Sequence, residues 1–166
     1  FGAIATIASA VLFGCMPMFV KTILAGGSNT LTITGLRFLL SLPALFLFLK
    51  KKKISLAISG KEARQIFFLT VFGYGITPIL LFASYNFIPS GMATTIHFCY
   101  PAFTILGCIL FLKQKPQLQK LICIALCMAG ILLFYNGSEN AAGLFPGMLL
   151  AFSSGITYSF YVIYLD

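Results

Sequence analysis

A single histidine and a proline one helical turn later stand inside an otherwise apolar stretch. His97 and Pro101 lie within residues 91–112, which carry no formal charge but include Thr94 and Tyr100. An imidazole can bind a substrate or relay a proton, and the ring of Pro101 removes the amide that would bond to the carbonyl of His97. The alternative is a neutral histidine that hydrogen-bonds to a neighbouring helix, and the sequence favours neither interpretation.

Other polar residues in apolar stretches extend this candidate site. Asn86 ends the preceding apolar stretch, and Tyr158 belongs to the last one. Arg37 stands about six residues inside the second stretch, where it lines a substrate path or, as we favour, snorkels to the surface and fixes helix depth. Polar groups in lipid are costly unless they face protein or water. We therefore predict a substrate cavity lined by His97, Tyr100, Pro101, Asn86, Tyr158 and Arg37.

The composition sets these residues in a membrane protein. Of the 166 residues, 60% are hydrophobic and only 8% are charged, and the mean hydropathy is +1.02. A soluble domain has about 25% charged residues. The chain is therefore predicted to be an all-α, polytopic bundle of transmembrane helices.

Six apolar stretches are long enough to cross a bilayer. Turn-forming or polar segments separate them, among them AGGSNT, the polar segment Lys50–Gln65 and the turn Ile88-Pro89-Ser90-Gly91. Within the third stretch, Gly73, Gly75 and Pro78 indicate a hinge, a local cavity or a packing feature. The predicted spans are residues 1–24, 31–49, 66–88, 91–112, 118–135 and 143–165.

Positive charge orients the predicted spans. Six of the eleven Lys and Arg residues lie between the second and third spans, and three lie between the fourth and fifth. The positive-inside rule places loops 50–65 and 113–117 in the cytoplasm, and we expect the protein to lie in the plasma membrane. The net charge of +8 therefore reflects topology rather than nucleic-acid binding. Anionic lipid headgroups are the expected partners of Lys50, Lys51, Lys52 and Lys53.

Enzyme and cofactor chemistry find no support in the sequence. No predicted span contains Asp or Glu, and no phosphate-binding loop, zinc-protease motif or nucleophile elbow is present. Cys123 and Cys127 share a helix face, but two thiols without further ligands make a weak metal site. We predict no enzyme activity, no cofactor and no metal.

Two spans carry stripes of small residues every fourth position. The last span has Gly143, Gly147, Ala151, Gly155 and Ser159; the first has Gly2, Thr6, Ala10 and Gly14. Small stripes let helix backbones approach closely in lipid. The two spans also align without gaps when Gly2 is set on Gly147. This alignment indicates that the last span opens a second five-span unit of inverted orientation, an architecture typical of secondary transporters.

Two longer runs resemble a known family. SAVLFGCMPMFVK followed by TGLRFLLSLPAL, and the run from SGMATTIHFCYPAF to CMAGILLF, are similar to the EamA family of the drug/metabolite transporter superfamily. Phe13-Gly14, Lys21, Arg37-Phe38, Pro101 and Gly130 carry the resemblance. Gln114-Lys115 replaces the family's Glu-Arg, and Cys123 replaces a glycine.

The resemblance implies ten spans in two inverted repeats around a central cavity. Residues 1–136 would be the first repeat and residues 143–166 the first span of the second, so we expect the chain to be truncated. The implied function is alternating-access transport of a small metabolite, an amino acid or a hydrophobic amine. The rivals are a homodimeric transporter of the small multidrug resistance type, although the first span lacks its glutamate, and a non-transporting sensor or assembly module.

Overall fold

The chain is a multi-pass membrane protein built of helices. The computed structural model describes residues 2–53, 58–113 and 141–165, and between the last two ranges residues 118, 119, 122, 124–126, 129 and 130. Within these residues every regular element is helical, and five helices are long and apolar enough to cross a membrane. The all-α fold class is confirmed. The predicted span 118–135 and loop 113–117 lie largely outside the described residues.

Eight helical segments make up these five spans. Two of the spans contain an irregularity: α3, η1 and α4 are continuous, and a short break separates α5 from α6. The segments are α1 (Gly2–Ala25), α2 (Thr30–Lys51), α3 (Gly60–Phe68), η1 (Leu69–Gly75), α4 (Ile76–Ser84), α5 (Ser90–His97), α6 (Tyr100–Leu112) and α8 (Ala141–Leu165).

The third span begins and ends earlier than the sequence analysis predicted. It runs from Gly60 to Ser84 rather than over residues 66–88, so residues 60–65 are helical and do not belong to the predicted loop 50–65. The reason is a capping box. The Ser59 hydroxyl accepts a hydrogen bond from the Glu62 amide, and the Glu62 carboxylate accepts one from the Ser59 amide. Both bonds satisfy amides that a helix start leaves unpaired.

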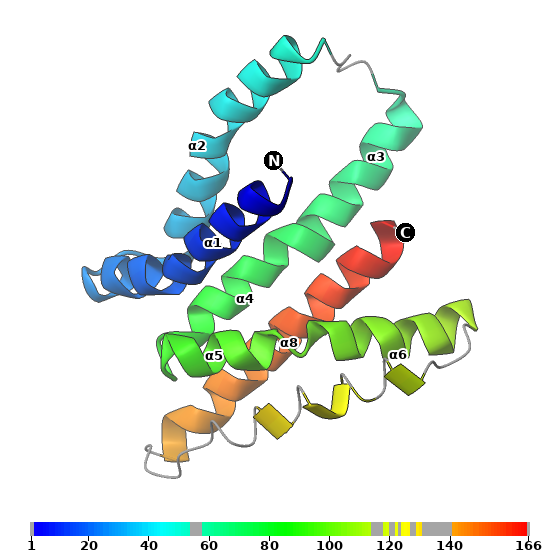
Figure 1. Ribbon diagram of the computed structural model, residues 1–166. Helices are drawn as coiled ribbons and strands as arrows, with labels where there is room; N and C mark the ends of the chain where they lie inside the picture. Colours follow the sequence, from blue (N-terminus) through cyan, green and yellow to red (C-terminus); the bar gives the residue numbers. More distant parts are fainter. Residues whose placement is uncertain are drawn as a thin grey trace.

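A tight turn joins the first two helices. Gly27 has a φ of +88°, a left-handed conformation that favours glycine. Asn29 then caps α2, because its side-chain oxygen accepts a hydrogen bond from the Leu31 amide at 3.2 Å. The turn and the cap together change the direction of the chain between the end of α1 and the start of α2 (Figure 1).

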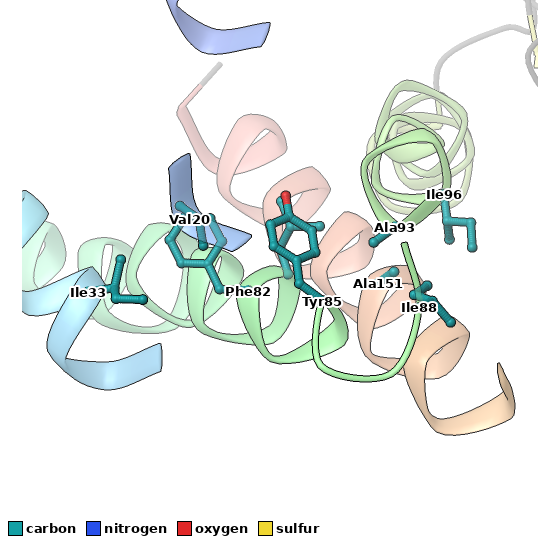
Figure 2. Close-up of a cluster of buried hydrophobic side chains, with 9 residues drawn as sticks. Val20, Ile33, Phe82, Tyr85, Ile88, Ala93, Ile96 and Ala151 are labelled. Atoms are coloured by element: carbon teal, nitrogen blue, oxygen red, sulfur yellow. The ribbon is translucent and has the colours of Figure 1, made fainter. Parts of the chain in front are cut away.

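The helix α8 lies along the third span, and α5 and α6 cross the pair (Figure 1). The buried core gathers near the connection between α4 and α5. Phe82 and Tyr85 come from the third span, Ala93 from α5 and Ala151 from α8 (Figure 2). By contrast, most long apolar side chains of α1 and α2 are exposed. In a membrane-spanning bundle such faces meet lipid.

The small-residue stripe of α8 forms its packing face, as predicted. Ala151 is fully buried. A Cβ atom added at Gly147 would stand 2.8 Å from Cβ of Phe87, and one at Gly155 would stand 3.1 Å from the carbonyl oxygen of His97. The absence of side-chain bulk therefore lets α8 approach the backbone of its neighbours.

The corresponding stripe of α1 is used differently. A Cβ atom added at Gly2 or Gly14 would meet nothing within 4 Å. The two stripes share a pattern, but in the described residues only that of α8 makes close helix contacts.

Candidate functional site

Residues from all five described spans line one partly open cavity. It offers about 100 Å³ to the centres of water molecules, which is well above the roughly 10–15 Å³ that a cavity needs to hold one water. Four of the residues predicted from sequence line it. Its walls are Phe13 and Met16 of α1, Arg37 of α2, Tyr74 of η1, Thr77, Pro78, Leu81 and Phe82 of α4, His97 of α5, Phe98, Tyr100 of α6 and Tyr158 of α8.

A side-chain hydrogen bond holds His97 against α8. Its Nδ1 atom lies 2.9 Å from Oγ of Ser154, and both residues are buried. Ser154 Oγ also lies 2.6 Å from the carbonyl oxygen of Ala151, to which it donates. A hydroxyl has one proton, so both contacts are satisfied only if Nδ1 of His97 carries its own proton and donates to Ser154. Nδ1 of His97 therefore carries a proton, and a neutral ring at this position is the Nδ1–H tautomer.

The other ring nitrogen of His97, Nε2, makes no hydrogen bond among the described residues. With the proton on Nδ1, Nε2 is a hydrogen-bond acceptor. Among the described residues, no side-chain nitrogen or oxygen is both fully enclosed and unbonded. Nε2 therefore has access to the cavity that His97 lines. The sequence left two interpretations of His97 open, a hydrogen bond to a neighbouring helix and a place in a cavity. In the fold His97 has both, because it bonds to Ser154 and lines the cavity.

Tyrosine rings form one wall beside the histidine. Tyr100 and Tyr158 meet edge to face, with ring centroids 4.7 Å apart, and the Tyr158 centroid lies 5.7 Å from that of His97. Tyr161 continues the row, 5.9 Å from Tyr158 and 5.3 Å from Tyr74. We call Tyr74, Tyr100, Tyr158 and Tyr161 the tyrosine row. It joins three spans, and three of its members, Tyr74, Tyr100 and Tyr158, line the cavity.

Arg37 brings a cation to the cavity. Its side chain is partly buried, and its guanidinium carbon lies 6.0 Å from the centre of the neighbouring Phe38 ring. The structure records no ion pair for it among the described residues. The three acidic residues of the sequence are Glu62, Glu139 and Asp166; Glu62 is engaged in the cap of α3, and the other two lie outside the described residues.

An irregular helix turn on the third span lies at the cavity residues Tyr74 and Thr77. Residues Leu69–Gly75 form a π-helix, a rare geometry that is frequent at functional sites. A Cβ atom added at Gly73 would stand 2.8 Å from Cβ of Tyr161, so the small residue admits α8. Thr77 bonds to the Gly73 carbonyl at 2.6 Å and to Thr157 of α8 at 2.9 Å. The interruption seen in the sequence thus serves both packing and the cavity.

The break between α5 and α6 has polar support. Tyr100 begins α6 and Pro101 occupies its first turn, where a missing amide costs nothing. The Tyr100 carbonyl accepts hydrogen bonds from Ser159 of α8 at 2.7 Å and from Thr104 at 2.9 Å. The carbonyl of His97, which the proline was predicted to free, faces Gly155.

Two predicted lining residues lie elsewhere. Asn86 is exposed in the turn after α4, and its amide donates to the Ala83 carbonyl at 3.2 Å. Pro101 is exposed and is not part of the cavity wall, although it marks the helix break. The neighbour of Asn86, Tyr85, turns inward instead, and its hydroxyl lies 3.2 Å from that of Thr94.

Sequence reasoning missed Tyr74 and Thr77. Their signal was present, because Tyr74, Thr77 and Leu81 follow each other at spacings of three and four and so share one helix face. In this part of the span, the residues identified from the sequence were only Gly73, Gly75 and Pro78.

A second, wider concavity follows the small-residue face of α1. Its volume is about 680 Å³, and Phe13, Phe98 and Tyr100 line both spaces. Its other walls are Ala5, Thr6, Ser9, Ala10, Gly14, Pro17 and Thr94. The central cavity and the face of α1 are therefore separated only by a few side chains.

The sequence model of the EamA-like transporter family matches residues 1–136, which include four of the five spans above. The chain belongs to the EamA-like transporter family. A protein of Synechocystis sp. (strain ATCC 27184 / PCC 6803 / Kazusa), named Uncharacterized transporter sll1319, is similar to this EamA chain, with 33% identity over 90 residues. The match covers 52% of this chain and 27% of that relative. No solved structure matches the chain.

Proposed function

We propose that this EamA-family protein is a membrane transporter that carries a small organic molecule through its central cavity. The observation that carries the proposal is a partly polar cavity inside a bundle whose outer faces are apolar. Ionisable groups inside a membrane bundle are costly and generally mark substrate or ion paths. The family and the name of the relative support the same class of activity.

Within this proposal, His97, Tyr100 and Tyr158 contact the substrate and Arg37 supplies a charge. Pro101 acts indirectly, through the break that sets the position of Tyr100. We do not assign Asn86 a contact with the substrate, because its amide is exposed and bonded to its own turn.

The proposed mechanism is alternating access between two inverted repeats. Residues 1–136 would be the first repeat, and residues 143–166 would open the second. The matching stripes of α1 and α8 support this division. So does the packing of α8 across α4, α5 and α6, because inverted-repeat transporters place their substrate site where the repeats meet.

The proposed location is the plasma membrane, with the α2–α3 connection in the cytoplasm. The end of α2 carries four lysines in a row, Lys50, Lys51, Lys52 and Lys53. Cations at this end of a helix interact favourably with the helix dipole and with anionic headgroups. This orientation follows the positive-inside rule.

A flux measurement tests the transport function and needs no choice of substrate. Proteoliposomes containing the full-length protein are loaded with an aqueous small-molecule extract of the source cells, and the retained compounds are quantified by mass spectrometry over time. We expect at least one compound to leave faster than from protein-free vesicles. A non-transporting sensor or assembly module would leave every compound at the protein-free rate.

The variant His97→Ala links that flux to the cavity. Losing the hydrogen bonds of the imidazole costs about 1–3 kcal/mol, so we expect transport to fall by about 5- to 150-fold with normal membrane insertion. The matched control is Phe160→Ala on the exposed face of α8, which should transport at the native rate. Equal flux for His97→Ala and native protein would refute the role of this cavity.

A further inference from the structure

We infer that the cavity selects an organic carboxylate with an aromatic body and rejects a hydrophobic amine of the same size. This inference rests on the proposed function and names the substrate class of the same site. It follows from three features of the cavity wall: the charge of Arg37, the tyrosine row, and the free acceptor atom of His97.

The guanidinium of Arg37 gives the cavity wall a positive charge. Arg37 lines the cavity, and the described residues that line it include no other Arg and no Lys, Asp or Glu. At an effective dielectric constant of about 20, a like charge about 6 Å away disfavours binding by about a hundredfold, and an opposite charge favours it by the same factor. The planar guanidinium fork also matches the two oxygens of a carboxylate. The cavity therefore favours an anionic headgroup.

The lack of acidic residues strengthens this point. A site that binds amines in a membrane bundle needs a carboxylate to compensate the ammonium charge. Of the three acidic residues of the sequence, Glu62 is engaged in the cap of α3 and Glu139 and Asp166 lie outside the described residues; no Asp or Glu is among the described residues that line the cavity. Tyrosine faces can attract cations, but here they share the space with a guanidinium.

The remaining wall is suited to an aromatic body. Tyr100 and Tyr158 already meet edge to face at 4.7 Å, and further ring faces come from Tyr74, Phe13 and Phe98. Aromatic pairs prefer such edge-to-face or offset contacts. The space between the lining side chains is about 550 Å³ with open solvent included, which lies within the range of about 300–1,000 Å³ found for ligand pockets.

His97 adds a preference for a hydrogen-bond donor on that molecule. In the neutral ring its Nε2 accepts a hydrogen bond, because Nδ1 holds the proton that it donates to Ser154. A hydroxyl near the carboxylate would satisfy this acceptor. Among simple aromatic acids, 3-phenyllactate therefore fits the wall better than 3-phenylpropanoate, which lacks the hydroxyl.

Binding of three matched probes tests the inference. The full-length protein in nanodiscs is titrated with 3-phenyllactate, 3-phenylpropanoate and 2-phenylethylamine by isothermal calorimetry. We expect both acids to bind at least tenfold more tightly than the amine, with 3-phenyllactate the tightest. An amine that binds as tightly as the acids would overturn the inference.

Arg37→Gln should remove the preference for acids and bring the three affinities within about threefold of each other. Arg64→Gln, which removes the same charge from the exposed start of α3, should keep the native order. If Arg37→Gln does not fold, Arg37→Lys provides a second test, because it keeps the charge and loses the planar guanidinium. This variant should bind both acids more weakly than the native protein does, but still more tightly than it binds the amine. Native preference in Arg37→Gln would overturn the inference.

Glu139 provides a further check, because it lies outside the described residues and is a potential partner for Arg37. A preference for acids that appears only in Glu139→Gln would overturn the inference for the native protein. Binding of none of the three probes would overturn it as well. The transport function would survive either result, since it depends on the flux of extract compounds.

Discussion

His97 of α5 and Ser154 of α8 are joined by a hydrogen bond of 2.9 Å between Nδ1 and Oγ. The bond links two spans that are separated by 57 residues in the sequence, and it fixes which nitrogen of the ring faces the cavity. A buried hydrogen bond between helices thus also sets the chemistry of the proposed binding site.

Removing the serine hydroxyl should disturb both properties. In Ser154→Ala, Nδ1–H of His97 loses its buried acceptor, which costs about 1–3 kcal/mol. We expect a lower thermal unfolding temperature in detergent and weaker binding of 3-phenyllactate. Ser153→Ala is the matched control, because its side chain makes no recorded hydrogen bond. Equal unfolding temperatures for the two variants would show that the bond contributes nothing.

Close packing at Gly147 should make even alanine unfavourable. A Cβ atom there would stand 2.8 Å from Cβ of Phe87, an atom fixed to the backbone. Overpacking of this kind costs about 1–3 kcal/mol, which outweighs or cancels the helix propensity gained. We expect Gly147→Ala to unfold at a lower temperature than Gly35→Ala, which has open space and the same propensity gain. The opposite order would mean that α8 does not approach this turn closely.

The capping box should govern the start of the third span. Ser59→Ala removes the acceptor of the Glu62 amide, and loss of such a cap costs about 1 kcal/mol. We expect amide hydrogen exchange in residues 60–63 to rise by about fivefold, with no change in α8. Ser28→Ala, in the α1–α2 turn, serves as control. Unchanged exchange at residues 60–63 would indicate that the helix begins later, as the hydropathy pattern predicted.

The orientation can be measured by thiol labelling from either side of the membrane. In a background without native cysteines, Lys52→Cys should react with an impermeant maleimide only when the cytoplasmic side is open. Ser28→Cys, in the turn at the other end of α2, should react in intact cells. Both residues are exposed. The reverse pattern would contradict the positive-inside assignment.

The sequence by itself predicted much of the architecture, because a bilayer is crossed by long apolar helices, and such helices can be recognised from the order of apolar and polar residues. The four described spans that begin the chain, the packing stripe of α8 and the membership in a transporter family were all predicted. So was the gathering of His97, Tyr100, Tyr158 and Arg37 as candidates, since polar side chains within apolar stretches are few. The start of the third span was wrong because the Ser59–Glu62 signal was overlooked.

The tertiary structure decided which face of each helix turns inward. Asn86 and Tyr85 are neighbours in the turn after α4, yet only Tyr85 is buried, because contacts with the other spans decide which side chain of the turn points inward. The tautomer of His97 likewise depends on Ser154 and Ala151, which lie on a distant part of the chain. Local sequence determines that a helix forms in lipid, whereas the side chains that share a cavity are determined by contacts between helices.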